Sequence, residues 1–186
     1  VLAFWSLIRF LMYSAKGPET ALFWSHFGSI GATFCAVLIL HFFIVFTGSI
    51  SPFLKRFLLT PAYLVAFVLS LLDLTTNLID APPVRHFWGY SSDPGPLYLI
   101  NVFHVVGCVL LGLFFAVRYY FRVHTINEQK QAKLLILAIS IPLIVGIATE
   151  VLPGFFHMPV PPLTTTSTTV LMIVIAYTMY RYKLMM

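Results

Sequence analysis

Charged residues are scarce in this sequence. Asp, Glu, Lys and Arg make up 9% of its 186 residues, whereas hydrophobic residues make up 60%. Soluble domains carry about 25% charged residues, so the composition excludes an ordinary soluble domain. The formal net charge is +5, but the basic residues lie at the ends of apolar runs without a stacking platform of aromatic side chains, which argues against nucleic-acid binding.

Sequence motifs of catalysis and metal binding are also missing. The two cysteines, Cys35 and Cys108, lie inside apolar runs and form no CxxC pair, so neither a zinc site nor a redox motif is indicated. The sequence contains no HExxH, no GxSxG and no phosphate-binding glycine loop. We therefore predict that this region is not an enzyme and that it uses no cofactor and no metal.

What the sequence does contain is a series of long apolar runs separated by short polar loops. This pattern predicts an all-α fold, a polytopic bundle of transmembrane helices that forms one domain over residues 1–186 with no soluble domain. The first run is too short to cross a bilayer, which needs roughly 20 residues. We interpret it as one partial span, truncated at the N-terminus, from a parent with seven helices. The partial span and five complete spans are expected at residues 1–13, 21–48, 57–79, 97–121, 133–152 and 164–181.

The basic residues orient these helices, because Lys and Arg gather on the cytoplasmic side of membrane proteins. Eight of the eleven Lys and Arg residues fall in three regions that alternate onto one side, residues 55–56, 118–133 and 181–183. The opposite loops hold only Lys16 and Arg85. The C-terminus is therefore predicted to be cytoplasmic.

Polar residues inside the spans gather in their outer halves. A charge in hydrocarbon costs at least ~2.5–3.5 kcal/mol, so such residues normally face a bundle interior or a wet cavity. We predict an outward-facing polar pocket that binds a ligand. Arg9, His26 and the threonines at 164–169 lie at the same level. The residues predicted to contact the ligand are Asp73, Asn77, Asn101, His104 and Glu150.

Structural interpretations of the same residues stay open. Asp73 and Arg9 can form an ion pair, or Asp73 can be a neutral acid bonded to Asn101. Asn and Thr stripes also join helices by hydrogen bonds, and the small residues of "GSIG" at 28–31 indicate close helix packing.

Two cofactor hypotheses can be weighed by depth in the membrane. A haem between His41 and His104 is excluded, because the two residues lie roughly 18 Å apart along the membrane normal. A metal site fits in depth and in ligand type but draws its four ligands from different segments, so separate side chains are the simpler interpretation. Those four residues are Asp73, His104, Glu150 and His157.

Several segments resemble a known family. They are "ALFWSHFGSIGATFCAVLILHFFIVFTG", "GPLYLINVFH", "RYYFRVHTINEQKQAKLLILAISIPLIVG" and the closing "VIAYTMYRYKL". Together they resemble the N-terminal seven-transmembrane sensor region of bacterial membrane histidine kinases and related signalling proteins. The resemblance implies a multi-pass protein of the bacterial inner membrane that precedes a cytoplasmic output module, in agreement with the predicted cytoplasmic C-terminus. It implies no defined ligand.

Three functions are compatible with these observations. The first is a sensory domain that detects a small extracellular or membrane-borne ligand under a lid formed by the loops around 85–96 and 154–162, and that signals to a cytoplasmic module. The second is a non-catalytic integral subunit of a larger membrane complex, with neighbouring subunits, lipid or a second copy of the chain as partners. The third is a transporter, against which stands the lack of ionisable residues other than His41 in the inner half of the spans.

Overall fold

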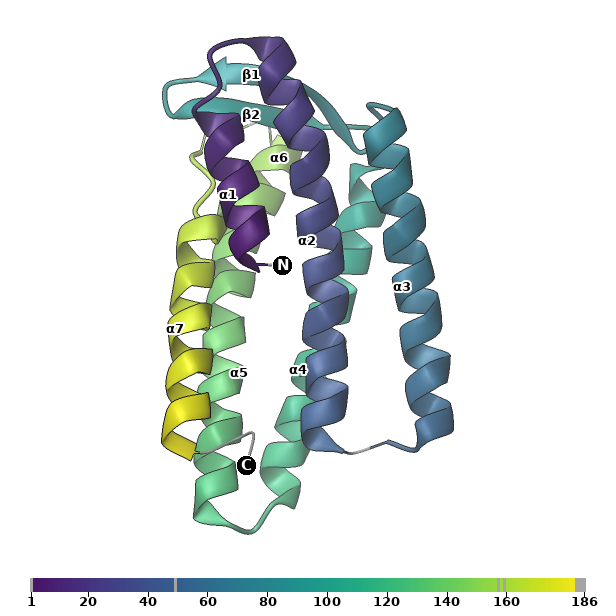
Figure 1. Cartoon of the computed structure of the whole chain (residues 1–186), viewed down its shortest axis with the longest axis vertical. Coiled ribbons are helices and arrows are strands. Elements are labelled where there is room, and N and C mark those ends of the chain that lie inside the picture. The colour runs from purple at the N-terminus through teal and green to yellow at the C-terminus, as the bar shows by residue number, and fades with distance from the viewer. Residues whose placement is uncertain (1, 49, 157, 159, 183–186) are drawn as a thin grey trace.

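The helices run side by side along one axis, and a β-hairpin covers one end of them (Figure 1). A computed structural model describes residues 2–48, 50–156, 158 and 160–182. The order along the chain is α1 (Leu2–Tyr13), α2 (Pro18–Thr47), α3 (Pro52–Thr75), β1 (Asp80–His86), β2 (Gly89–Pro94), α4 (Tyr98–Arg122), α5 (Ile126–Gly146), the π-helix η1 (Ile147–Val151), α6 (Leu152–Phe156) and α7 (Thr164–Tyr182).

Each predicted span falls on a helix, and the predicted helical membrane bundle is confirmed. Among the described residues, four helices are long and apolar enough to cross a bilayer: α2, α3, α4 and the continuous helical stretch Ile126–Phe156. Five complete spans were predicted, but the described apolar part of α7, Thr164–Thr178, is shorter than a bilayer crossing requires. The same holds for α1.

Local sequence sets several helix starts. Pro18 and Pro52 occupy the first turns of α2 and α3, where the missing N–H costs nothing. The Ser51 hydroxyl accepts a hydrogen bond from the Leu54 N–H, and the Thr125 hydroxyl accepts one from the Glu128 N–H at the start of α5. These N-caps satisfy donors that the first helical turn leaves free.

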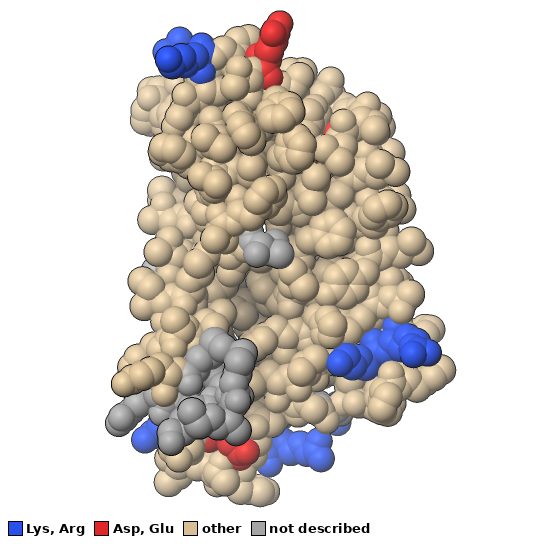
Figure 2. Space-filling model, in the orientation of Figure 1, with Lys and Arg blue, Asp and Glu red and all other residues tan. Residues whose placement is uncertain are grey.

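The core lies around α2, which packs on α1, α3 and α4, while α5 packs on α4 and α7. Fully buried apolar side chains of α2, such as Val37, Leu40 and Phe43, form its centre. Outside the core, α3 exposes a row of large apolar residues. Figure 2 shows a broad band without visible charge, with Lys and Arg side chains mainly at the end away from the hairpin. These features fit a bundle surrounded by lipid.

The segment predicted as a loop at 85–96 is part of a two-stranded antiparallel hairpin that pairs His86 with Gly89. Sequence alternation does not signal it, because β1 contains two prolines and the register is irregular between Asp80 and Pro83. Gly89 has a φ of 126°, and a Cβ there would lie 2.3 Å from the Tyr13 carbonyl oxygen. Only glycine fits this turn, which seats the hairpin against the end of α1.

Candidate ligand pocket

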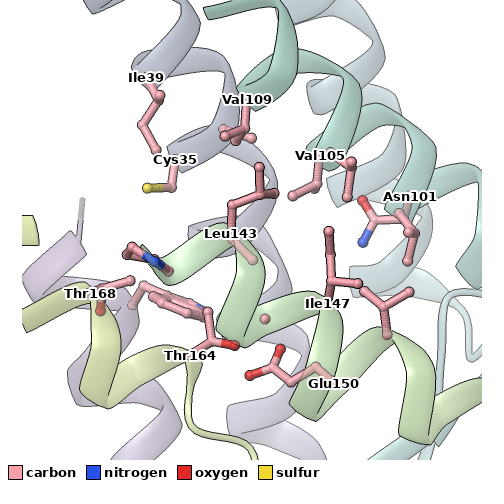
Figure 3. Close-up of a pocket in the computed structure, with 18 of the residues that line it drawn as sticks. Cys35, Ile39, Asn101, Val105, Val109, Leu143, Ile147, Glu150, Thr164 and Thr168 are labelled. Atoms are coloured by element: carbon pink, nitrogen blue, oxygen red, sulfur yellow. The ribbon is translucent and has the colours of Figure 1, made fainter. Parts of the chain in front are cut away.

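A cavity of about 190 Å³ lies inside the bundle, lined by α1, α2, β1, α4, α5, η1 and α7. Most of its wall is aliphatic. Figure 3 shows Ile39, Val109 and Leu143 on one side of it, and Glu150 and Thr164 presenting oxygen atoms on the other. The cavity therefore has an apolar body and one polar end.

The polar end carries buried groups without hydrogen-bond partners. Within the described part of the chain, the Nε of Arg9, the Oε1 of Glu150 and the Oγ1 of Thr164 are buried and unpartnered. Each such atom costs roughly 1–3 kcal/mol unless something satisfies it. A polar ligand group or ordered water in this space would satisfy all three.

A second cavity of about 440 Å³, with a more polar lining, lies beneath the hairpin. Its wall includes polar residues of β2, such as Ser91, Ser92 and Asp93, together with Thr149 of η1. Four residues line both cavities and so mark the junction between them: Arg9, Asp80, Tyr98 and Glu150. The apolar cavity thus continues into a polar space at the hairpin end of the bundle.

The π-helix η1 carries Glu150 to this junction. π-turns are often found at functional sites, because one extra residue re-aims the side chains around it. The Thr149 hydroxyl donates to the Val145 carbonyl at 2.8 Å and accepts the Leu163 N–H at 3.2 Å. Thr149, which precedes Glu150 in the chain, therefore links the end of α5 to the start of α7.

Two of the five predicted contact residues lie at this cavity. Asn101 and Glu150 line it, and the Asn101 side-chain oxygen accepts a hydrogen bond from the Thr33 hydroxyl at 3.2 Å. Asp73, Asn77 and His104 are not part of its lining.

These three residues have different surroundings. Asp73 is fully buried on α3, accepts a hydrogen bond from the Asp80 N–H at 3.3 Å and lies 3.9 Å from the His26 Nδ1. Asp73 thereby joins α3 to the start of the hairpin. Asn77 is exposed after the end of α3, and His104 is half-buried with an Nε2 that has no hydrogen-bond partner in the described region.

The structure adds Asp80, Tyr98 and Arg9 to the polar end of the cavity. The sequence placed Arg9 at the level of the pocket but indicated no role for Asp80 or Tyr98. No sequence signal places Asp80 beside Arg9, because the backbone turns at Thr76 and the strand then crosses the end of the bundle.

The carboxyl of Asp80 lies in the hairpin, outside the spans, and is an unusually weak acid. Burial and the negative charge of Asp73 together raise its pKa to about 7, against the opposing charges of Arg9 and His26. Asp80 therefore changes protonation near neutral pH at the junction of the two cavities.

No group of three or more His, Cys, Asp or Glu side chains is placed to hold a metal ion among the residues that the structure covers. His157, one ligand of the hypothetical metal site, lies outside the described residues. His41 instead pairs with the Tyr63 hydroxyl at 3.0 Å in the inner half of the bundle.

Comparison with protein families identifies the chain. The family described as the N-terminal 7TM region of histidine kinase matches residues 1–186, the whole sequence. The chain belongs to this family. The resemblance stated from the sequence is thus confirmed, and the pocket belongs to a histidine kinase membrane region. Searches of curated proteins and of solved structures found no match to this 7TM region.

Proposed function

We propose that this chain is the sensory part of a histidine kinase, and that a small molecule binding in the cavity changes the activity of a cytoplasmic kinase module. The observation that carries the proposal is the polar end of the cavity, where Arg9, Glu150 and Thr164 hold buried atoms without partners. Intramembrane ionisable residues that face a cavity are expensive to keep and are typically functional.

The proposed contact residues are Asn101 and Glu150, joined by Arg9 and Thr164. Asp73 acts indirectly, because its carboxylate holds the backbone of Asp80 and so positions the hairpin. In this proposal the hairpin, which includes most of the predicted lid loop at 85–96, covers the outer end of the site. We assign no ligand contact to Asn77 or His104 in this arrangement.

The signal would travel through α7, which lines the cavity with Thr164 and Thr168 and packs along α5. A ligand can shift the arrangement of α5 and α7 only by the difference in its affinity for two states. Binding at Glu150 favours one arrangement of η1, and the Thr149–Leu163 hydrogen bond passes this to the start of α7. The proposed orientation puts the hairpin outside a bacterial inner membrane and the end of α7 in the cytoplasm.

Autophosphorylation of a kinase module fused after Met186 tests the proposal. In membrane vesicles, Glu150→Gln and Asn101→Ala should each change autophosphorylation several-fold, because each alters a polar side chain that lines the cavity. Glu19→Gln is the matched control, since Glu19 is exposed in the first turn of α2 at the same end of the bundle. Wild-type output from both cavity variants, with normal insertion, would contradict the proposal.

A further inference from the structure

Three ionisable groups line the polar end of the cavity, Arg9, Asp80 and Glu150, and two of them, Arg9 and Glu150, do not pair with each other in the described structure. Arg9 and Glu150 are near enough to interact electrostatically, yet they form no ion pair within 4.0 Å in the part of the chain that is described. The Arg9 Nε can only donate a hydrogen bond, whereas an ionised Glu150 can only accept. A group that fills this space must therefore present an acceptor to Arg9 and a donor to Glu150.

A single charge would not suit this space. A simple anion would be attracted by Arg9 but repelled by Glu150, and a simple cation would be attracted by Glu150 but repelled by Arg9. A head group with both charges avoids these repulsions and forms two charge-assisted hydrogen bonds, which are stronger than neutral ones.

The body of the cavity limits the size and shape of the group attached to this head. A dry cavity of roughly 150 Å³ holds a benzene molecule, so a cavity of about 190 Å³ has room for a somewhat larger small molecule. Its walls are branched aliphatic side chains, including Val105, Val109 and Leu143. The cavity is thus suited to a short branched hydrocarbon group and is too small for a lipid chain.

The route into the cavity favours a ligand from water. The second cavity, beneath the hairpin, is lined by Ser91, Ser92 and Asp93 and meets the apolar cavity at Arg9 and Glu150. A solute carrying two charges would cross this polar space at little cost in free energy. Entry from the lipid would cost much more, because both charges would lose their hydration.

From these observations we infer that the ligand is a free aliphatic α-amino acid. Its carboxylate binds Arg9, its ammonium group binds Glu150, and its branched side chain lies among the aliphatic residues of α4 and α5. This inference rests on the proposed function and adds the ligand class to it.

Cys35 allows binding to be measured apart from signalling, because it is a free thiol that lines the cavity. In a Cys108→Ser background Cys35 is the only thiol, since the chain has two cysteines. In proteoliposomes, leucine should slow alkylation of Cys35 by N-ethylmaleimide about fivefold or more. Two analogues that each lack one charge, 4-methylpentanoate and 3-methylbutylamine, should give little protection at the same concentration.

Charge removal at Glu150 provides the decisive comparison. Glu150→Gln should weaken radiolabelled leucine binding about 10- to 100-fold, because one charge-assisted hydrogen bond is lost. The same variant should bind 4-methylpentanoate better than wild type does, because the repulsion is removed. Glu19→Gln, a change on the exposed start of α2, should bind both like wild type. If Cys35 does not react with N-ethylmaleimide, the radiolabelled binding measurement tests the ligand class by itself.

Failure of this inference and failure of the proposed function are separable. Equal or tighter binding of a singly charged analogue by wild type, or no binding of any of the three compounds, would overturn the amino-acid ligand. Neither result would contradict the sensory role, because that role is tested separately by the effect of Glu150→Gln on autophosphorylation. Leucine binding without any change in kinase output would support the ligand class and contradict the sensory role.

Discussion

Arg9, Glu150 and Thr164 show how single residues give this bundle its polar site. Each holds a buried atom that finds no hydrogen-bond partner in the described structure, at a cost of roughly 1–3 kcal/mol apiece. In an interior lined mostly by aliphatic side chains, these atoms would stabilise a bound polar ligand far more than they stabilise the empty protein. Asp80 stands beside them with a carboxyl that titrates near neutral pH.

Stability should fall as pH rises through the range of Asp80. The pKa of Asp80 is raised by burial and by Asp73 to about 7 in the folded state, from 3.8. The folded protein therefore binds this proton more tightly than the unfolded chain does, so the stabilisation is complete below about pH 4 and is lost as pH approaches 7. Asp80→Asn should raise the melting temperature at pH 8 by several degrees, because asparagine buries no charge there.

At pH 5 the advantage of Asp80→Asn should shrink, because wild-type Asp80 is then protonated and the neighbouring charges of Arg9, His26, Asp73 and Glu150 act on a neutral group in both proteins. The control is Asp93→Asn, because Asp93 is an exposed residue of β2, and it should leave the melting temperature unchanged at both pH values. Thermal unfolding in detergent at pH 5 and pH 8 measures the difference. Equal shifts at the two pH values would contradict the raised pKa.

Contacts between whole elements place these residues. The short α1 carries Trp5 and Arg9 to the cavity and lies along α2, where Gly31 accepts the Trp5 side chain. At the other wall, η1 places Glu150 and ties α5 to α7. The site therefore depends on two close approaches, α1 on α2 and α5 on α7.

Gly31→Ala should separate α1 from α2. A Cβ at this position would lie 2.8 Å from the Trp5 Cβ and 3.2 Å from its Cα, too close for either to remain in place. We expect a loss of about 1–3 kcal/mol in the free energy of unfolding. Gly107→Ala on α4 is the control, since a Cβ there meets nothing within 4 Å and should change stability by no more than about 1 kcal/mol. Equal stability of both variants in a denaturant titration would show that α1 does not pack here.

Thr149→Val should loosen the start of α7. Valine keeps the shape of the side chain but cannot accept the Leu163 N–H, which the Thr149 hydroxyl binds at 3.2 Å. Loss of one hydrogen bond should speed hydrogen exchange of the segment containing Leu163 about 2- to 10-fold. Ser140→Ala, which removes a hydroxyl bonded within α5 to the Ile136 carbonyl, should leave that segment unchanged. Unaltered exchange in Thr149→Val would contradict a link between η1 and α7.

At the scale of the whole molecule, charge and hydrophobicity divide the bundle into three zones. The hairpin caps one end, apolar side chains cover the middle, and most visible basic residues lie at the other end (Figures 1 and 2). Because Lys and Arg mark the cytoplasmic side, the two cavities near the hairpin are expected to open outward. Ligand from outside and output inside would then be separated by the length of α7.

Single cysteines test this orientation. With Cys35 and Cys108 replaced by serine, Phe87→Cys introduces a thiol at the exposed hairpin turn, and His124→Cys introduces one in the exposed loop between α4 and α5. A membrane-impermeant maleimide should label position 87 in intact cells and position 124 only after permeabilisation. The reverse pattern would invert the proposed topology.

The sequence alone determined the membrane class, the positions of the helices and the family. These depend on local composition and on the length of apolar runs, which act within one segment at a time. The level of each polar residue in the bilayer was readable for the same reason, since it depends on the distance along a helix. Asn101 and Glu150 were identified in this way, and both line the cavity.

Which polar residues meet depends on how the helices pack. Asp73 and Glu150 lie at similar levels, but α3 packs on the side of α2 away from α5 and α7, so Asp73 contacts the hairpin and not the cavity (Figure 1). The hairpin itself, the π-turn at Glu150 and the placement of Asp80 beside Arg9 depend on contacts between segments far apart in the chain. Hydrophobic periodicity specifies which side of a helix is buried, but it does not specify the neighbour that buries it.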